Sequence, residues 1–205
     1  MKTIKYLTLG LLTLVMSCNG QTKKENKTKD GLTEDNIPSF IEAYLIKEHR
    51  TGTEKLPVDT AIIDGKKEIY MDEGLGGTSY SLPMDNKEFL KGDITGDSKQ
   101  DIIVSIGHSF GASGHATIYF LFGGDGDAFS FITTFDSFDL GLCKTNGDLP
   151  GQFYPDQIKT GTLIGTSHCY TTEDAKCCPS KKFENTFKYN PQTKKLSLIK
   201  QTEKK

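Results

Sequence analysis

Short apolar runs separated by turn-forming residues fill the chain after Gly52, and this spacing constrains the fold more than any other feature. Such runs between Gly, Asp, Asn and Pro are typical of strands in a meandering antiparallel sheet. Strands are predicted at residues 60–63, 68–71, 102–106, 117–122, 130–135, 162–169, 183–189 and 196–199. Hairpin turns are predicted at residues 123–127 and 190–193, where Gly, Asp, Asn and Pro gather.

One helix is predicted ahead of the strands, at residues 37–48. Asn36 can cap it, and Pro38 suits its first turn. Apolar residues recur at helical spacing, so that one face packs onto a sheet: Ile37, Phe40, Ile41, Tyr44 and Leu45. The predicted fold class is therefore α+β, a mainly antiparallel sheet with one N-terminal amphipathic helix packed on it, in a single domain over residues 33–205.

The first eighteen residues have the form of a secretory signal. Lys2 and Lys5 precede an apolar run at residues 6–16, and small Ser17 then precedes Cys18. The run is well short of the roughly 20 residues that span a bilayer, and no later segment approaches that length. The end of the segment resembles the bacterial lipobox, which implies that residues 1–17 are a signal peptide and that Cys18 becomes the acylated N-terminus.

Acylation of Cys18 predicts a protein held at a membrane, because several acyl chains on one residue give stable anchoring. Residues 18–32 are polar and charged, which predicts a lipidated, flexible tether. Asn19 follows the cysteine in place of the Asp that favours inner-membrane retention in enteric bacteria, so we expect the outer membrane of a Gram-negative envelope.

The charge balance argues against nucleic acid as a partner. The chain has 25 Lys+Arg and 27 Asp+Glu, and loss of Lys2 and Lys5 with the signal leaves a net charge of about −4. A basic patch for nucleic acid or anionic lipid is not predicted.

Four further cysteines would lie in an oxidising compartment, where disulfides persist: Cys143, Cys169, Cys177 and Cys178. Four cysteines allow three pairings. Adjacent Cys177 and Cys178 point to opposite faces of an extended segment and can reach different partners, or they can bond to each other. Zinc is the other interpretation, although CxxC spacing is absent.

An acidic loop at residues 93–101 is the main candidate site. Side chains of Asp93, Thr95, Asp97 and Asp101, with the backbone carbonyl of Lys99, provide oxygens at alternate loop positions, which suits calcium. The loop resembles those of dockerins and FG-GAP repeats, but Thr95 replaces an acidic residue and Ser98 a glycine. A turn whose carboxylates accept backbone N–H bonds, with no metal, is the alternative.

Gly107-His108-Ser109-Phe110-Gly111 follows a predicted strand and matches the GxSxG nucleophile elbow of α/β-hydrolases. The alternative function is therefore a serine hydrolase using Ser109 and His168, with Asp136, Asp139 or Asp148 as the acid. That elbow requires a helix after the serine, whereas residues 116–122 predict a strand. A Gly-rich loop between two strands is thus the competing interpretation.

From about Phe89 onward the chain resembles a group of uncharacterised bacterial envelope proteins. The shared features are a GDxxGDxxxD loop entering a strand, a Gly/Ser loop, a hairpin, and a CCPS motif, here Cys177 to Ser180. The resemblance implies a Cys143–Cys169 pair and a Cys177–Cys178 pair. The group has no assigned activity, so the resemblance names no function. We therefore expect a non-enzymatic binding or structural module held at the membrane.

Overall fold

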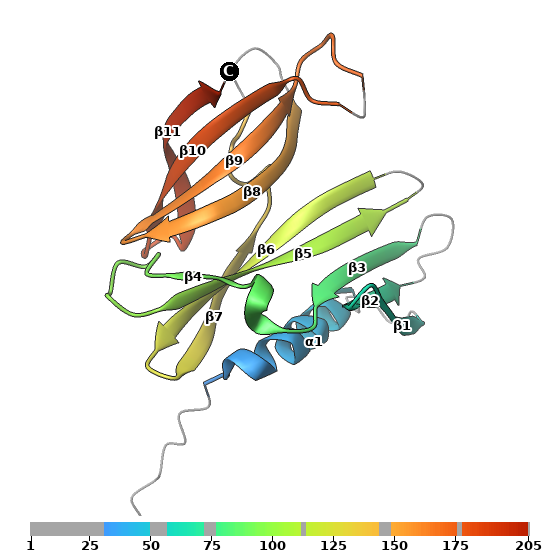
Figure 1. Ribbon diagram of the computed structural model, residues 1–205. Coiled ribbons are helices and arrows are strands. Elements are labelled where there is room, and N and C mark those ends of the chain that lie inside the picture. Colours follow the sequence, from blue (N-terminus) through green and yellow to red (C-terminus); the bar gives the residue numbers. More distant parts are fainter. Residues whose placement is uncertain are drawn as a thin grey trace, which may run out of the picture. The chain divides into compact units, whose positions relative to one another are not determined.

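Two antiparallel sheets and one α-helix make up the part of the protein that the structure describes (Figure 1). The computed structural model describes residues 31–49, 57–71, 77–111, 114–143, 149–175 and 178–204. The predicted signal peptide, Cys18 and residues 18–30 of the predicted tether lie outside these ranges. Among the described residues, no helix has both the length and the apolar character needed to cross a membrane.

The first sheet contains seven strands among the described residues, in the order β1-β2-β3-β5-β6-β7, with β4 paired to β5. The strands are β1 (Val58–Ile63), β2 (Lys66–Met71), β3 (Thr78–Pro83), β4 (Leu90–Gly92), β5 (Asp101–Phe110), β6 (Gly114–Asp125) and β7 (Ala128–Phe135). All of these pairs are antiparallel. The long β5–β6 hairpin forms the middle of the sheet.

The second sheet has the order β11-β10-β9-β8 and is also antiparallel. Its strands are β8 (Leu149–Lys159), β9 (Thr162–Tyr170), β10 (Lys181–Asn190) and β11 (Lys195–Lys204). Strand β8 contains Pro155 and has register irregularities on both sides of it. Proline lacks a backbone N–H and is tolerated at a sheet edge, which is where β8 lies.

Helix α1 (Ile37–His49), after a short 3-10 turn η1 (Glu34–Asn36), covers one face of the first sheet (Figure 1). Ile37, Ile41 and Leu45 are buried along one stripe of the helix, as the helical spacing predicts. On the sheet side, Phe120 and Phe122 lie in the same apolar cluster. This cluster is the first of two cores.

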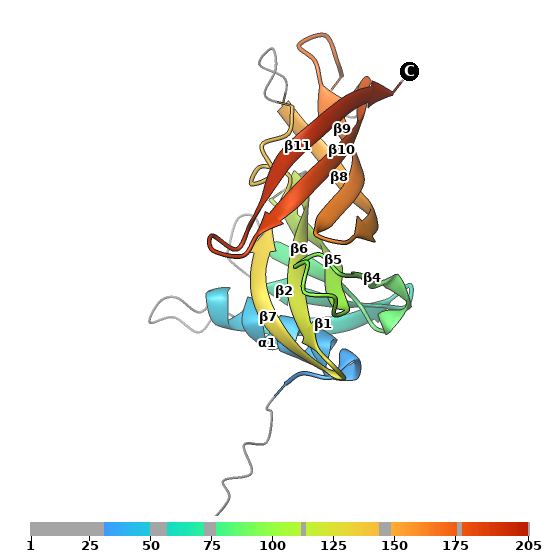
Figure 2. The ribbon, with the colours of Figure 1, turned by 90° about the vertical axis from the view of Figure 1, so that its left-hand side faces the viewer.

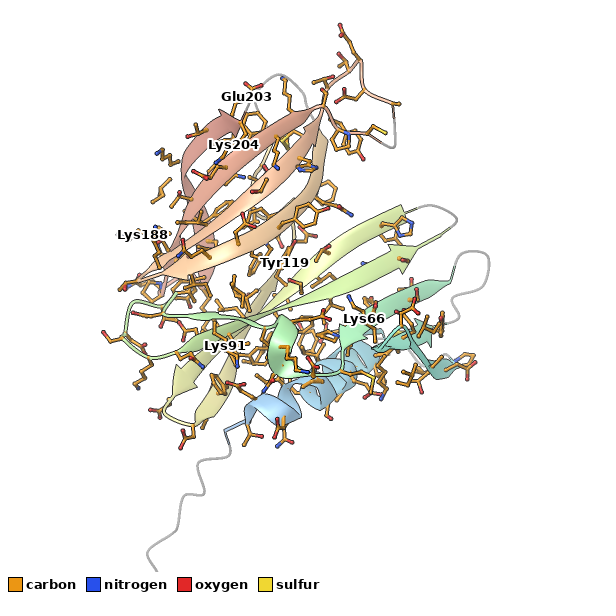
Figure 3. The ribbon with its side chains drawn as sticks, viewed as in Figure 1. Lys66, Lys91, Tyr119, Lys188, Glu203 and Lys204 are labelled. Carbon is orange, nitrogen blue, oxygen red and sulfur yellow. A yellow bond between two sulfur atoms is a disulfide. The ribbon has the colours of Figure 1, made fainter. Side chains whose placement is uncertain are left out.

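The second core lies between the other face of the first sheet and the second sheet. Tyr119 and Leu121 of β6 meet Phe153 and Phe187 there, and all four side chains are buried. The hydroxyl of Tyr119, a side chain labelled in Figure 3, donates a hydrogen bond to the carbonyl of Phe153. This bond joins β6 directly to β8. Burial raises the pKa of Tyr119, which keeps this hydroxyl protonated as a donor.

The eight predicted strands are all present, and each predicted range lies within an observed strand. Strands β3, β4 and β8 were not predicted. Strand β3 contains Pro83, β4 has only three residues, and β8 contains two prolines. The described residues are predominantly antiparallel β-sheet with one short N-terminal helix, so α+β fits the fold only loosely.

A disulfide joins Cys143, in the loop after β7, to Cys169 of β9, with Cα atoms 5.5 Å apart. The pairing that the family resemblance implied for these two cysteines is therefore confirmed. In the chain-entropy account, a cross-link between residues 26 positions apart stabilises the fold by about 3.5 kcal/mol. Cys178 is also disulfide-bonded, and Cys177 lies outside the described residues.

Candidate functional site

The acidic loop connects the end of β4 at Gly92 to the start of β5 at Asp101. Asp101 has no solvent-exposed surface. Its Oδ2 accepts the backbone N–H groups of Ile94 and Thr95 at 2.9 and 2.8 Å, and its Oδ1 accepts that of Gly124 at 3.0 Å. The carboxylate therefore ties the loop both to itself and to strand β6.

The other two aspartates of the loop also accept backbone N–H groups. Asp93 accepts from Gly96 at 2.7 Å and from Ser98 at 3.1 Å, and Asp97 accepts from Lys99 at 2.9 Å. Gly96 and Ser98 have φ of 80° and 67°, so the chain turns sharply at both positions. A serine adopts this left-handed conformation less readily than glycine. The hydrogen bonds of Asp93 to both residues compensate for that cost.

Two contacts hold the acidic loop against neighbouring segments. The backbone carbonyl of Asp93 accepts the backbone N–H of Gly161, in the β8–β9 turn, at 2.8 Å, which joins the loop to the second sheet. Lys99 Nζ lies 3.0 Å from Asp125 Oδ1 at the β6–β7 turn, and hydrogen bonding to Asp125 raises the pKa of Lys99. Both contacts position the loop from outside it.

These hydrogen bonds match the metal-free turn that was the alternative interpretation of the sequence. They also occupy carboxylate oxygens that calcium would need as ligands. In the part of the chain that the structure describes, no group of three or more His, Cys, Asp or Glu side chains is arranged to hold a metal ion. Thr95 Oγ1 is buried without a hydrogen-bond partner among the described residues. The loop thus has one unsatisfied oxygen, while its carboxylates already accept N–H groups.

Ser109 lies within strand β5, between Ser79 of β3 and His115 of β6. Its Oγ is 3.0 Å from Nδ1 of His115, and this pair is exposed at the surface. The segment after Ser109 returns as strand β6, so the strand–turn–helix arrangement of a nucleophile elbow is not formed.

Of the other predicted triad members, those that the structure describes do not lie beside Ser109. His168 lies in β9 of the second sheet, where its ring contacts that of Tyr154. Asp136 accepts the backbone N–H groups of Phe138 and Asp139 in its own turn, and Asp139 accepts that of Asp136. Asp148 lies outside the described residues.

Two contributors to these sites were not predicted. Ser109 and His115 are paired across the β5–β6 hairpin. Residues at equal distances from a hairpin turn face each other, so a hairpin predicted between them would have indicated this pair. Gly124 approaches the loop so closely that an added Cβ would lie 2.0 Å from the carbonyl oxygen of Gln100. Its role depends on a contact between strands that no local pattern encodes.

Comparison of the chain with protein families, with curated proteins and with solved structures finds no match.

Replacing Asp101 with Ala is expected to lower the free energy of unfolding by about 2–4 kcal/mol, because three backbone N–H groups lose their acceptor. Asp101→Asn keeps one acceptor oxygen, so its free energy of unfolding should lie between those of Asp101→Ala and the wild type. Urea unfolding of the full chain in excess EDTA, followed by circular dichroism, measures both changes without a contribution from bound calcium.

The matched control is Asp97→Ala, since that carboxylate accepts a single exposed N–H group. We expect a loss of no more than about 1 kcal/mol for it. Equal losses for Asp101→Ala and Asp97→Ala would contradict the assigned role of Asp101.

Proposed function

We propose that this chain is an envelope lipoprotein, anchored through acyl chains on Cys18, whose residues 33–205 form a non-enzymatic binding or structural module. The order of Lys2 and Lys5, an apolar run, Ser17 and Cys18 is the observation that carries the proposal. The polar tether between Cys18 and the first described residues is long enough to hold the module away from the lipid surface. The net charge supports a partner other than nucleic acid.

The anchoring proposal is tested by replacing Cys18 with Ser. The wild-type chain, produced in a Gram-negative host, should incorporate labelled palmitate and sediment with outer membranes on a sucrose gradient. The Cys18→Ser chain should incorporate no label and leave the membrane fraction, because it lacks the thiol that is acylated.

Ser17→Ala is the matched control, since it keeps a small residue before the cysteine and should be labelled like the wild type. Palmitate labelling and membrane retention of the Cys18→Ser chain would refute the anchoring proposal.

We propose, secondly, that the acidic loop binds calcium and that the ion stabilises the module. Oxygen atoms at alternate positions of the loop support this proposal, as does the buried Thr95 Oγ1 that lacks a hydrogen-bond partner in the described residues. The hydrogen bonds that already occupy Asp93 and Asp101 weigh against it. Calcium would then act on stability and not on chemistry.

Thermal unfolding of the full chain in excess EDTA and in millimolar calcium tests this second proposal. A ligand at one hundred times its dissociation constant stabilises the native state by about 2.7 kcal/mol, which corresponds to a shift of several degrees. The shift should disappear in Asp93→Ala and Asp97→Ala. It should persist in Asp127→Ala, an exposed carboxylate in the β6–β7 turn. Identical melting temperatures in EDTA and calcium would reduce the loop to a turn.

A serine hydrolase is the alternative to the binding module. The observation that favours it is the 3.0 Å contact between Ser109 Oγ and His115 Nδ1. A histidine in this position can accept the hydroxyl proton. Opposing this, no carboxylate is found on His115 in the described part of the chain, although a third group normally orients the base.

Hydrolysis of an activated ester by the full chain separates the two functions. The binding-module proposal expects no turnover above that of denatured protein. Turnover that is lost in both Ser109→Ala and His115→Ala, and retained in Ser105→Ala on the same face of β5, would establish the hydrolase instead.

A further inference from the structure

A pocket of about 100 Å³ opens where the end of β7 meets the turn that leads into β11. The turn of the β10–β11 hairpin lies close to the end of β7 (Figure 2). Four apolar side chains contribute to its lining: Leu121, Phe135, Leu140 and Leu196. Three of these are buried in the second core, so the base of the pocket is formed by well-packed side chains.

The rim of the pocket carries more positive than negative charge. Lys194 and Lys195 both line it, and Asp139 is the single carboxylate among the lining residues. Within the described part of the chain, neither lysine forms an ion pair. Asp139 already accepts the backbone N–H of Asp136 through one oxygen. The two ammonium groups thus remain available to an anion.

The backbone at Lys194 is a second, independent observation. Its φ of 55° lies in the left-handed region, where a hairpin turn normally has Gly or Asn. A lysine in that position pays a conformational cost that glycine avoids. Backbone strain of this kind clusters at ligand sites, and here it sets a cationic side chain beside the pocket.

We propose that this pocket binds a small carboxylate whose apolar part is a short, branched aliphatic group. The volume is smaller than the roughly 150 Å³ cavity that holds benzene, which limits the apolar part to about four carbon atoms. The carboxylate pairs with Lys194 and Lys195, while the aliphatic group packs on the leucines and Phe135.

This proposal rests on the binding-module function and names a class of ligand for it. It requires neither acylation of Cys18 nor calcium at the acidic loop. A failed fractionation experiment and a failed ligand titration are therefore separate results.

Titration of the ¹⁵N-labelled full chain with 3-methylbutanoate, followed by NMR, tests the proposal. We expect saturable shifts at the backbone amides of Thr133, Phe135 and Leu196. The neutral amide of the same acid, 3-methylbutanamide, should cause none. Loss of either ammonium should weaken binding by about tenfold, because a hydrogen bond to a charged group is lost.

Lys194→Gly and Lys195→Gln are the informative variants. Glycine adopts the left-handed conformation without cost, so Lys194→Gly removes the ammonium and preserves the turn. Lys200→Gln, on β11 but outside the pocket lining, is the matched control and should bind like the wild type. Absence of saturable shifts, equal binding of the amide, or unchanged binding by both pocket variants would each overturn the proposal.

Discussion

Burial of residues 101–104 of β5 and 119–122 of β6 on both faces of the sheet is the constraint on which the rest of the structure depends. Ile102 and Phe122 face the core beneath helix α1, while Ile103 and Leu121 face the second sheet. Each buried side chain of this size stabilises the fold by about 1.5–3 kcal/mol, so neither face can be left to solvent. The helix and the second sheet are both required because one layer alone would expose half of these residues.

The second sheet is held to the first by polar contacts as well as by apolar packing. Tyr119 donates to the carbonyl of Phe153, and the carbonyl of Asp93 accepts the N–H of Gly161. Apolar packing is non-directional, whereas each hydrogen bond has a preferred geometry. The acidic loop, which supplies Asp93 and ends in buried Asp101, therefore helps to define how the two sheets meet, whether or not it holds an ion.

Sequence patterns predicted the elements whose signal is local. The helical spacing of Ile37, Ile41 and Leu45 located α1, and the apolar runs located the central strands. Strand β8 was not predicted because Pro155 argues against a strand, and only its position at a sheet edge makes the proline acceptable. Strand β3 alternates Ser79 and Ser81 with buried Tyr80 and Leu82, a pattern that Pro83 and the neighbouring glycines obscure.

The candidate sites were less predictable because their partners come from distant segments. The spacing of the aspartates indicated a tight loop, and the same spacing serves calcium ligands and N–H acceptors alike, so sequence could not separate them. The distinction depends on where Gly124 lies, 23 residues beyond Asp101. The pocket lined by Lys194 and Lys195 forms where the β10–β11 turn meets the end of β7. That contact depends on the second sheet packing on the first, which no local pattern predicts. The sequence thus predicts which residues form a tight acidic loop, whereas the contacts of that loop and of the pocket with distant segments arise from the packing of the two sheets.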